Sequence, residues 1–107
     1  MEKIADLKEK AKIGWASFIS FEALTSTAAP KLIEFARVNK EMKLLDVACG
    51  TGVVALTASR VGAEVEGVDL TPELISRANE NSKIMGVEAK FIEGDAEFLP
   101  YKEDEFD

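Results

Sequence analysis

Three aspartates between positions 46 and 95 stand where apolar stretches are interrupted or end. Asp46 interrupts the run LLDVACGTG, Asp69 ends EVEGVD, and Asp95 follows FIEG. A carboxylate accepts several hydrogen bonds, so it can hold ribose hydroxyls, an amino group or a cationic ammonium group. The pattern predicts three polar contacts to one small ligand, provided that the fold brings these side chains together.

Two glycines follow Asp46 in the stretch CGTGVVA. Gly50 and Gly52 let the backbone turn tightly and approach a ligand where a β-carbon would intrude. Ala55 keeps the start of the following helix close to the preceding strand. Taken alone, the spacing Gly50-x-Gly52-x-x-Ala55 also matches a dinucleotide-binding fingerprint, and it fits equally well a tight turn that binds nothing.

Hydrophobic patterning predicts the elements that must position these residues. Short apolar runs over 43–48, 64–69 and 88–93 predict strands, and a helical period follows each of the first two. Strand, helix, strand, helix, strand is typical of an α/β, doubly wound parallel sheet of Rossmann-like type with right-handed crossovers. In such a sheet small ligands bind at the carboxyl ends of the strands, which is where the three aspartates fall.

Glycine and proline mark the bounds of the two crossover helices. Gly62 and Gly86 are well placed as C-terminal stops. Thr71 followed by Pro72 predicts a helix start, with the threonine hydroxyl as the cap.

The first 42 residues predict a helical lead-in. An apolar stripe from Ile4 to Phe21 indicates one or two helices with a break near Gly14. Ser26 or Thr27 could cap a further helix that runs to about Val38.

The aromatic residues are few, and their roles are less distinct. Trp15, Phe18 and Phe21 could cover a ligand, although an aromatic stripe at helical spacing more often belongs to a core. Tyr101 could contact a substrate or lie in a surface loop. The acids over 103–107 are expected to form a solvated run.

Composition excludes several classes of function. The chain has 107 residues and a net charge of −7, which argues against binding of nucleic acid or anionic lipid through a general field. Histidine is absent, which removes the commonest general base and zinc ligand, and we predict no metal site. The single cysteine, Cys49, fits a reducing compartment and has no histidine to activate it as a nucleophile. With no secretory signal and no membrane-spanning run, we expect a cytoplasmic protein.

At the motifs LLDVACGTG, VEGVDLTPELISRA and FIEGDAEFLPYKEDEFD, the chain resembles the class I S-adenosylmethionine-dependent methyltransferases. The resemblance covers roughly 42–107, with the motifs in family order and at family-like spacing. It is strongest to the small-molecule branch that includes the ubiquinone and menaquinone biosynthesis methyltransferases. It implies an enzyme that transfers a methyl group from S-adenosylmethionine to a small-molecule acceptor.

The resemblance implies which residues contact the methionine part of the cofactor. They are Asp46 and the loop residues Ala48, Cys49, Gly50, Thr51 and Gly52. Ala48 departs from the pattern, since the family often has glycine there, although alanine also occurs in this branch.

The adenosine part is assigned in the same way. Asp69 holds the ribose, with Leu70 beside the adenine. Asp95 reaches the adenine amino group, and Ala96 lies against the ring. No residue stands out as a catalytic base.

The resemblance also implies a domain division and a strand order. Residues 1–42 form the lead-in, and 43–107 form the first half of the cofactor-binding domain, with three strands in the order 3-2-1 and flanking helices. The family pattern continues into a fourth strand that pairs with the first. We therefore expect this chain to be the N-terminal half of a methyltransferase, inactive alone, that self-associates through the unpaired edge of its first strand.

Two alternatives remain open at this point. One is a fragment of an NAD(P)-dependent oxidoreductase, which Asp69 would also suit but Asp46 and Asp95 would not. The other is a non-catalytic module that keeps a Rossmann-like fold as an assembly surface.

Overall fold

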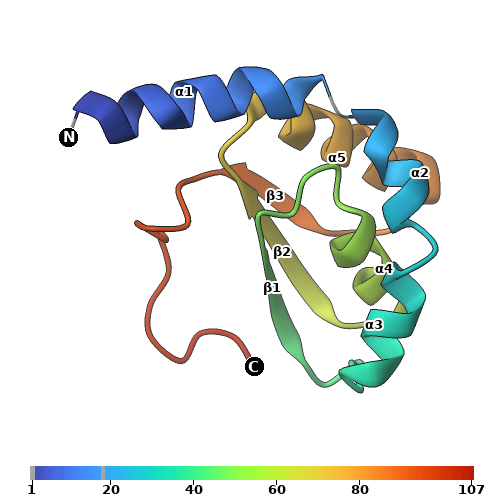
Figure 1. Ribbon diagram of the computed structural model, residues 1–107. Coiled ribbons are helices and arrows are strands. Elements are labelled where there is room, and N and C mark those ends of the chain that lie inside the picture. The colour runs from blue at the N-terminus through green and yellow to red at the C-terminus, as the bar shows by residue number, and fades with distance from the viewer. Residues whose placement is uncertain (1, 18) are drawn as a thin grey trace.

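The computed structural model describes residues 2–17 and 19–107. Its centre is one sheet of three parallel strands, β1 (Lys43–Val47), β2 (Glu64–Asp69) and β3 (Lys90–Glu93). The strands lie in the order β1-β2-β3 (Figure 1), which is the predicted 3-2-1 order viewed from the other side. The predicted fold class is therefore confirmed. β1 ends one residue earlier and β3 begins two residues later than the sequence suggested.

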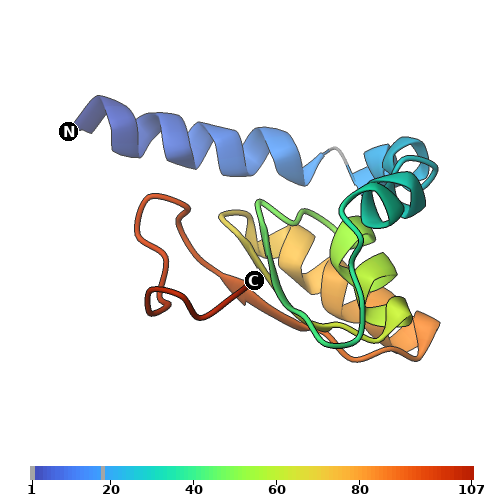
Figure 2. The ribbon, with the colours of Figure 1, turned by 90° about the horizontal axis from the view of Figure 1, so that it is seen from below.

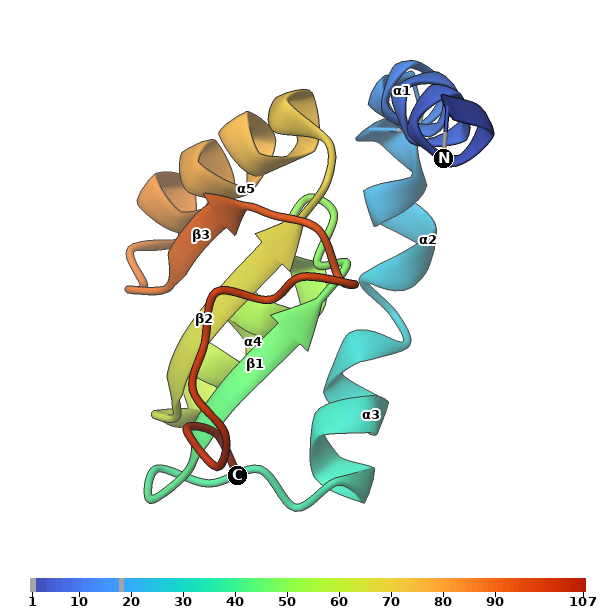
Figure 3. The ribbon, with the colours of Figure 1, turned by 90° about the vertical axis from the view of Figure 1, so that its left-hand side faces the viewer.

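The two crossover helices are α4 (Val53–Val61) and α5 (Pro72–Met85). Each ends where predicted, at a glycine in the left-handed conformation: φ is 105° at Gly62 and 67° at Gly86. Only glycine adopts this conformation without a steric cost, so both stops follow from local chemistry. Both helices pack on the same face of the sheet (Figure 3).

Small residues let these helices pack closely on the sheet. Ala55, Ala58 and Ala78 are completely buried. A β-carbon at Gly67 in β2 would come within 2.6 Å of the ring of Phe91 in β3. The ring of Phe91 therefore fills space that a glycine leaves, a contact that no local sequence pattern indicates.

Before the sheet, the residues that the structure describes form four helical segments. They are α1 (Glu2–Ala16), the 3-10 turn η1 (Ile19–Phe21), α2 (Glu22–Thr25) and α3 (Ala29–Phe35). α1 runs across the carboxyl-end side of the sheet (Figure 1), and the view from below shows it apart from the layer of strands and crossover helices (Figure 2). In the described part of the chain, no helix combines the length and apolar content that a membrane span needs.

The break expected near Gly14 falls just after it: α1 continues through Gly14, because a single glycine costs a helix only about 1 kcal/mol, and ends at Ala16. The predicted cap of the third helix was wrong. Ser26 and Thr27 do not cap α3, since their hydroxyls donate to Ala23 O at 2.9 Å and Leu24 O at 3.1 Å. α3 begins instead with Pro30 in its first turn, where a missing N–H has no cost.

The C-terminal segment crosses the face of the sheet opposite α4 and α5 (Figure 3). Tyr101 packs edge-on against Phe106, with 5.0 Å between ring centroids. Asp107 donates its N–H to Lys43 O at 2.7 Å and accepts the Lys43 N–H at 2.8 Å. The acids over 103–107 are thus not merely a solvated run, because the last of them pairs with the start of β1.

Candidate functional site

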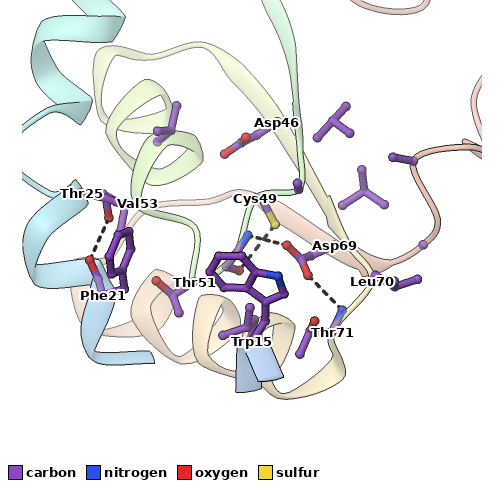
Figure 4. A pocket seen from close by; sticks show the side chains of 18 of the residues that line it. Trp15, Phe21, Thr25, Asp46, Cys49, Thr51, Val53, Asp69, Leu70 and Thr71 are labelled. Atoms are coloured by element: carbon purple, nitrogen blue, oxygen red, sulfur yellow. Dashed lines mark hydrogen bonds between the residues drawn. The ribbon is translucent and has the colours of Figure 1, made fainter. Parts of the chain in front are cut away.

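A cavity of about 560 Å³ opens at the carboxyl ends of β1 and β2, next to α1 and α2 (Figure 4). Its volume lies within the range of small-molecule sites. Nine of the ten residues predicted to bind the cofactor line it: Asp46, Ala48, Cys49, Gly50, Thr51, Asp69, Leu70, Asp95 and Ala96. The three aspartates therefore share one cavity, as their positions after three parallel strands predict.

The two loop glycines have different surroundings. A β-carbon at Gly50 would meet no protein atom within 4 Å, and Gly50 lines the cavity. Gly52 does not line it. A β-carbon there would lie 2.8 Å from Phe91 Cζ, so Gly52 is required for packing of the loop against β3. Both have positive φ, 57° and 85°, which favours glycine at each position.

Asp69 joins the glycine loop to the turn that leads into α5. Its Oδ2 accepts the Gly50 N–H at 2.8 Å, and its Oδ1 accepts the Thr71 N–H at 2.9 Å. Both bonds are visible in Figure 4. The hydroxyl of Thr71 forms no cap hydrogen bond, contrary to the prediction. A carboxylate has about four acceptor positions, so Asp69 keeps capacity for the two hydroxyls of a ribose.

Asp46 has a structural role that the sequence did not reveal. Its Oδ2 accepts the N–H of Ala55 at 3.2 Å, in the first turn of α4, where the helix dipole favours a negative charge. Burial, followed by the nearby charge of Asp69, nonetheless raises the pKa of Asp46 to about 6. The cavity therefore holds an acid that gains from a cationic neighbour.

Asp95 is held by the lead-in helix. Its Oδ2 accepts a hydrogen bond from Lys8 Nζ at 2.5 Å, and its Oδ1 accepts the Glu97 N–H at 3.0 Å. These two donors keep the pKa of Asp95 below its usual value. Lys8 lies 87 positions away in the sequence, and nothing in the local pattern predicts this pairing.

A second polar group ties α2 to α5 and to the glycine loop. Glu22, which lines the cavity, accepts hydrogen bonds from Arg77 Nη2 at 2.8 Å and Asn81 Nδ2 at 3.1 Å. Asn81 Nδ2 also donates to Thr51 O at 3.1 Å. The bond from Arg77 is the main reason that the pKa of Glu22 lies below its usual value. Sequence reasoning missed this group, because its members are far apart in the chain.

The aromatic residues contribute a wall to the cavity. Trp15 and Phe21 both line it (Figure 4) and are 55% and 48% exposed, so the expectation that they form core was wrong. They come from helices that pack on the cavity side and not on the sheet. Phe18 lies outside the described residues. Tyr101 is absent from the lining and contacts Phe106 instead.

Two loop residues can be compared with their expected roles. Ala48 has a φ of 60°, the left-handed region that a glycine would occupy without strain, which gives a physical reason for glycine at this position in the family. Burial, then the charges of Asp46 and Asp69, raises the pKa of the Cys49 thiol. A protonated, buried thiol is a packing group and a poor nucleophile, which agrees with the expectation for Cys49.

Comparison with known proteins gives an independent indication of what this cavity belongs to. A family model described as a methyltransferase domain matches residues 44–107. Demethylmenaquinone methyltransferase of Thermus thermophilus is 34% identical over 79 residues, which are 72% of this chain and 36% of that protein. The chain spans about a third of the length of the curated relatives it matches.

Solved structures agree with the family match. The YcgJ protein of Bacillus subtilis is 36% identical with a TM-score of 0.70, over 76% of this chain and 36% of that one. An RNA methyltransferase of Salinibacter ruber, solved with S-adenosyl-L-homocysteine, is 30% identical with a TM-score of 0.62, over 64% and 47% of the two chains. The chain belongs to the class I S-adenosylmethionine-dependent methyltransferases.

Proposed function

We propose that this chain forms the S-adenosylmethionine-binding portion of a methyltransferase that acts on a small molecule. The observation that carries the proposal is that Asp46, Asp69 and Asp95 line one cavity together with the glycine loop. The open space at Gly50 suits the close approach of a ligand to the backbone. When bound, S-adenosylmethionine supplies an activated methyl group on a sulfonium.

The donors and acceptors of the cavity suit each part of the cofactor. We assign the methionine part to Asp46 and the 48–52 loop, in which Gly52 acts through packing. We assign the ribose to Asp69, which retains acceptor capacity, and the adenine to Leu70 and Asp95. Ala96 would lie against the adenine ring.

Calorimetry on the purified chain tests this assignment. S-adenosylmethionine should bind and NAD should not, and the opposite result would favour the oxidoreductase alternative. Gly50→Ala should weaken cofactor binding about tenfold or more, since its β-carbon enters the cavity side of the loop. Its left-handed φ adds only about 1 kcal/mol of strain, so the fold should persist.

Gly14→Ala is the matched control for that substitution. A β-carbon added at Gly14 would also meet no atom within 4 Å, but Gly14 lies within α1 and outside the cavity lining. Equal loss of affinity in both variants would contradict the role assigned to the loop. Retention of a dimer with no cofactor binding would favour the assembly-module alternative.

The acceptor class is supported by two observations. The similar protein of Thermus thermophilus is named for a small quinone-type acceptor, demethylmenaquinone. The net charge of −7 disfavours a polyanionic nucleic acid. We expect no retardation of transfer RNA by this chain in a gel-shift assay at low salt, and a stable complex would contradict a small-molecule assignment.

The remaining parts of the proposal concern the chain by itself. We propose that it does not transfer a methyl group alone, because none of the described residues that line the cavity is a convincing base for an acceptor. We also propose that it acts in the cytoplasm, without a membrane or nucleic-acid partner, and self-associates through the edge of β1. Turnover on a quinol acceptor by the purified chain would overturn the first of these.

A further inference from the structure

The segments α1, η1 and α2 form a wall of the cavity without joining the core of the protein. Ala11 and Trp15 of α1, Phe21 of η1 and Glu22 of α2 line the cavity, and α1 runs across the carboxyl-end side of the sheet (Figure 1). None of the described side chains of these three segments is buried. Apolar burial supplies most of the stability of helices in proteins, so it holds this part of the chain only weakly.

The next helix, α3, is held differently. Its Ala29 and Ile33 are only 1% and 5% exposed. Ile33 belongs to the same core cluster as Leu56 of α4 and Val65 of β2. Residues 26–28 separate α2 from α3, so the boundary between the weakly held part and the anchored part lies there. A movement of α1, η1 and α2 about this short connection leaves the core intact.

Two ion pairs fasten the weakly held part to the rest of the protein. In α1, Lys8 Nζ lies 2.5 Å from Asp95 Oδ2, in the loop after β3. In α2, Glu22 Oε1 lies 2.8 Å from Arg77 Nη2 of α5. Neither Lys8 nor Arg77 is among the described residues that line the cavity. The two cations therefore act on the position of the wall and not on a ligand behind it.

Water reaches both ion pairs. Their four side chains are between 24% and 33% exposed. Attraction between charges at such positions is weak, and dissolved salt weakens it further. Because ion pairs and not a packed core close this wall, its opening depends on ionic strength.

We propose that α1, η1 and α2 form a lid latched by the Lys8–Asp95 and Glu22–Arg77 pairs, and that the latches set the rate of ligand exchange. This inference takes its ligand from the proposed function and adds control of entry and exit. A ligand needs the open form of the lid both to enter and to leave. A weaker latch therefore speeds association and dissociation together and leaves the dissociation constant nearly unchanged.

Trp15 provides the signal for measuring these rates. It is the single tryptophan of the chain, and it lines the cavity from the lid. Stopped-flow fluorescence with S-adenosylhomocysteine gives both rate constants. This ligand has no net charge near neutral pH, so salt acts on the latches and not on electrostatic steering of the ligand. From about 0.05 to about 0.5 M salt, both rate constants of the natural chain should rise about two- to fivefold.

Lys8→Gln and Arg77→Gln each remove the cation of one latch. At low salt each should raise both rate constants about two- to fivefold and keep the dissociation constant within about twofold. Lys10→Gln is the matched control. Lys10 also belongs to α1, but its partner Asp6, at 2.9 Å, lies on the same helix. This substitution removes an equal charge and no latch, so both rate constants should stay those of the natural chain.

The pattern of rates separates the lid from other roles of the two cations. Faster dissociation with unchanged association would overturn the lid, because Lys8 and Arg77 would then only support contacts with the bound ligand. Rates that neither substitution changes would overturn it as well. In both cases the ligand still binds, so the proposed function stands. Lys8 contacts only exposed or half-buried groups, so its variant keeps the test open if Arg77→Gln does not fold.

A ligand-free measurement covers the remaining outcome. Failure of S-adenosylhomocysteine to bind would contradict the proposed function and not the lid. Quenching of Trp15 fluorescence by acrylamide then tests the lid alone, because an open lid exposes this side chain further. Lys8→Gln and Arg77→Gln should increase the quenching and Lys10→Gln should not. Equal quenching in all three variants and the natural chain would overturn the lid.

Discussion

Among the single residues, Asp46 shows how one side chain serves both the fold and the site. It caps the first turn of α4 through the Ala55 N–H, and it lines the cavity with its charge only partly compensated. Its burial has a cost, because an ionised carboxylate loses hydration there. The protein retains a charge at this position although a neutral amide could make the same hydrogen bond to the helix.

The cost of burying this charge predicts that the difference in stability between the natural chain and Asp46→Asn depends on pH. The pKa of Asp46 is raised from 3.8 to about 6 in the folded chain, so the folded state binds the proton more tightly than the unfolded state. The contribution of Asp46 to stability should therefore fall as pH rises from about 4 to about 6 and stay low above that. Asp46→Asn does not titrate, and near neutral pH it should be more stable than the natural chain by about 1–2 kcal/mol.

Urea unfolding across this pH range provides the measurement. The difference in free energy of unfolding between Asp46→Asn and the natural chain should vanish near pH 4 and grow toward neutral pH. Asp104→Asn, at an exposed position, should show no such growth. A difference for Asp46→Asn that is independent of pH would show that the substitution acts through packing and not through the charge.

Among the helices, α1 and α2 cover the cavity through polar attachments. α1 is attached by Lys8 to Asp95, and α2 is attached by Glu22 to Arg77 and Asn81. Three apolar side chains of these helices, Leu7, Ile13 and Leu24, are more than 60% exposed and add little packing. Ion pairs that water reaches in this way contribute little stability each. The lead-in should therefore open locally at a lower free energy than the sheet.

Glu22→Gln tests that expectation. Loss of the charge at Glu22 weakens its bond to Arg77, so backbone amides of α1 and α2 should exchange with deuterium a few-fold faster. Amides of β1, β2 and α5 should exchange at unchanged rates.

Glu80→Gln is the matched control for Glu22→Gln. Glu80 is an exposed carboxylate that pairs with the same Arg77 at 3.7 Å. Because Glu80 and Arg77 both lie on α5, this ion pair joins no other helix to α5. Faster exchange throughout the sheet in Glu22→Gln would mean that the lead-in and the sheet open as one unit.

For the molecule as a whole, the edge of β1 that faces away from β2 is the feature that bears on assembly. The N–H and C=O of Lys43 point away from β2, as their hydrogen bonds to Asp107 show. By the two-residue period of a strand, the backbone groups of Leu45 and Val47 point to the same edge. In the described part of the chain, β1 pairs with one other strand, β2, and Val47 is 42% exposed. Edges of this kind pair with other chains.

We expect a concentration-dependent dimer that Leu45→Pro abolishes. Proline removes the N–H at the centre of this edge and leaves the β1–β2 hydrogen bonds, which come from the alternate residues, in place. Leu45→Ala is the control, because it removes the same side chain but keeps the N–H. Sedimentation should show a dimer for the natural chain and for Leu45→Ala, and a monomer for Leu45→Pro. A stable monomer of the natural chain at high concentration would contradict self-association through this edge.

Features that depend on neighbouring residues could be predicted from the amino-acid sequence. Apolar runs and their length identified the three strands, and Gly62 and Gly86 marked the ends of α4 and α5, because backbone conformation at a left-handed position is a local property. The three aspartates could be placed in one cavity, because carboxyl ends of parallel strands meet at one edge of a sheet. The family motifs added the identity of the ligand that such a cavity suits.

Contacts between distant groups became known only from the folded chain. It pairs Lys8 with Asp95 across 87 positions and Arg77 with Glu22 across 55, and it places Phe91 in the space left by Gly52 and Gly67. The cap of α5 also differs from expectation, since the Thr71 hydroxyl caps nothing and its N–H is bound by Asp69. The acid from β1 that bonds the first turn of α4 was not predicted. Such contacts depend on how helices and strands pack in three dimensions, and residue order near each position carries no record of that packing.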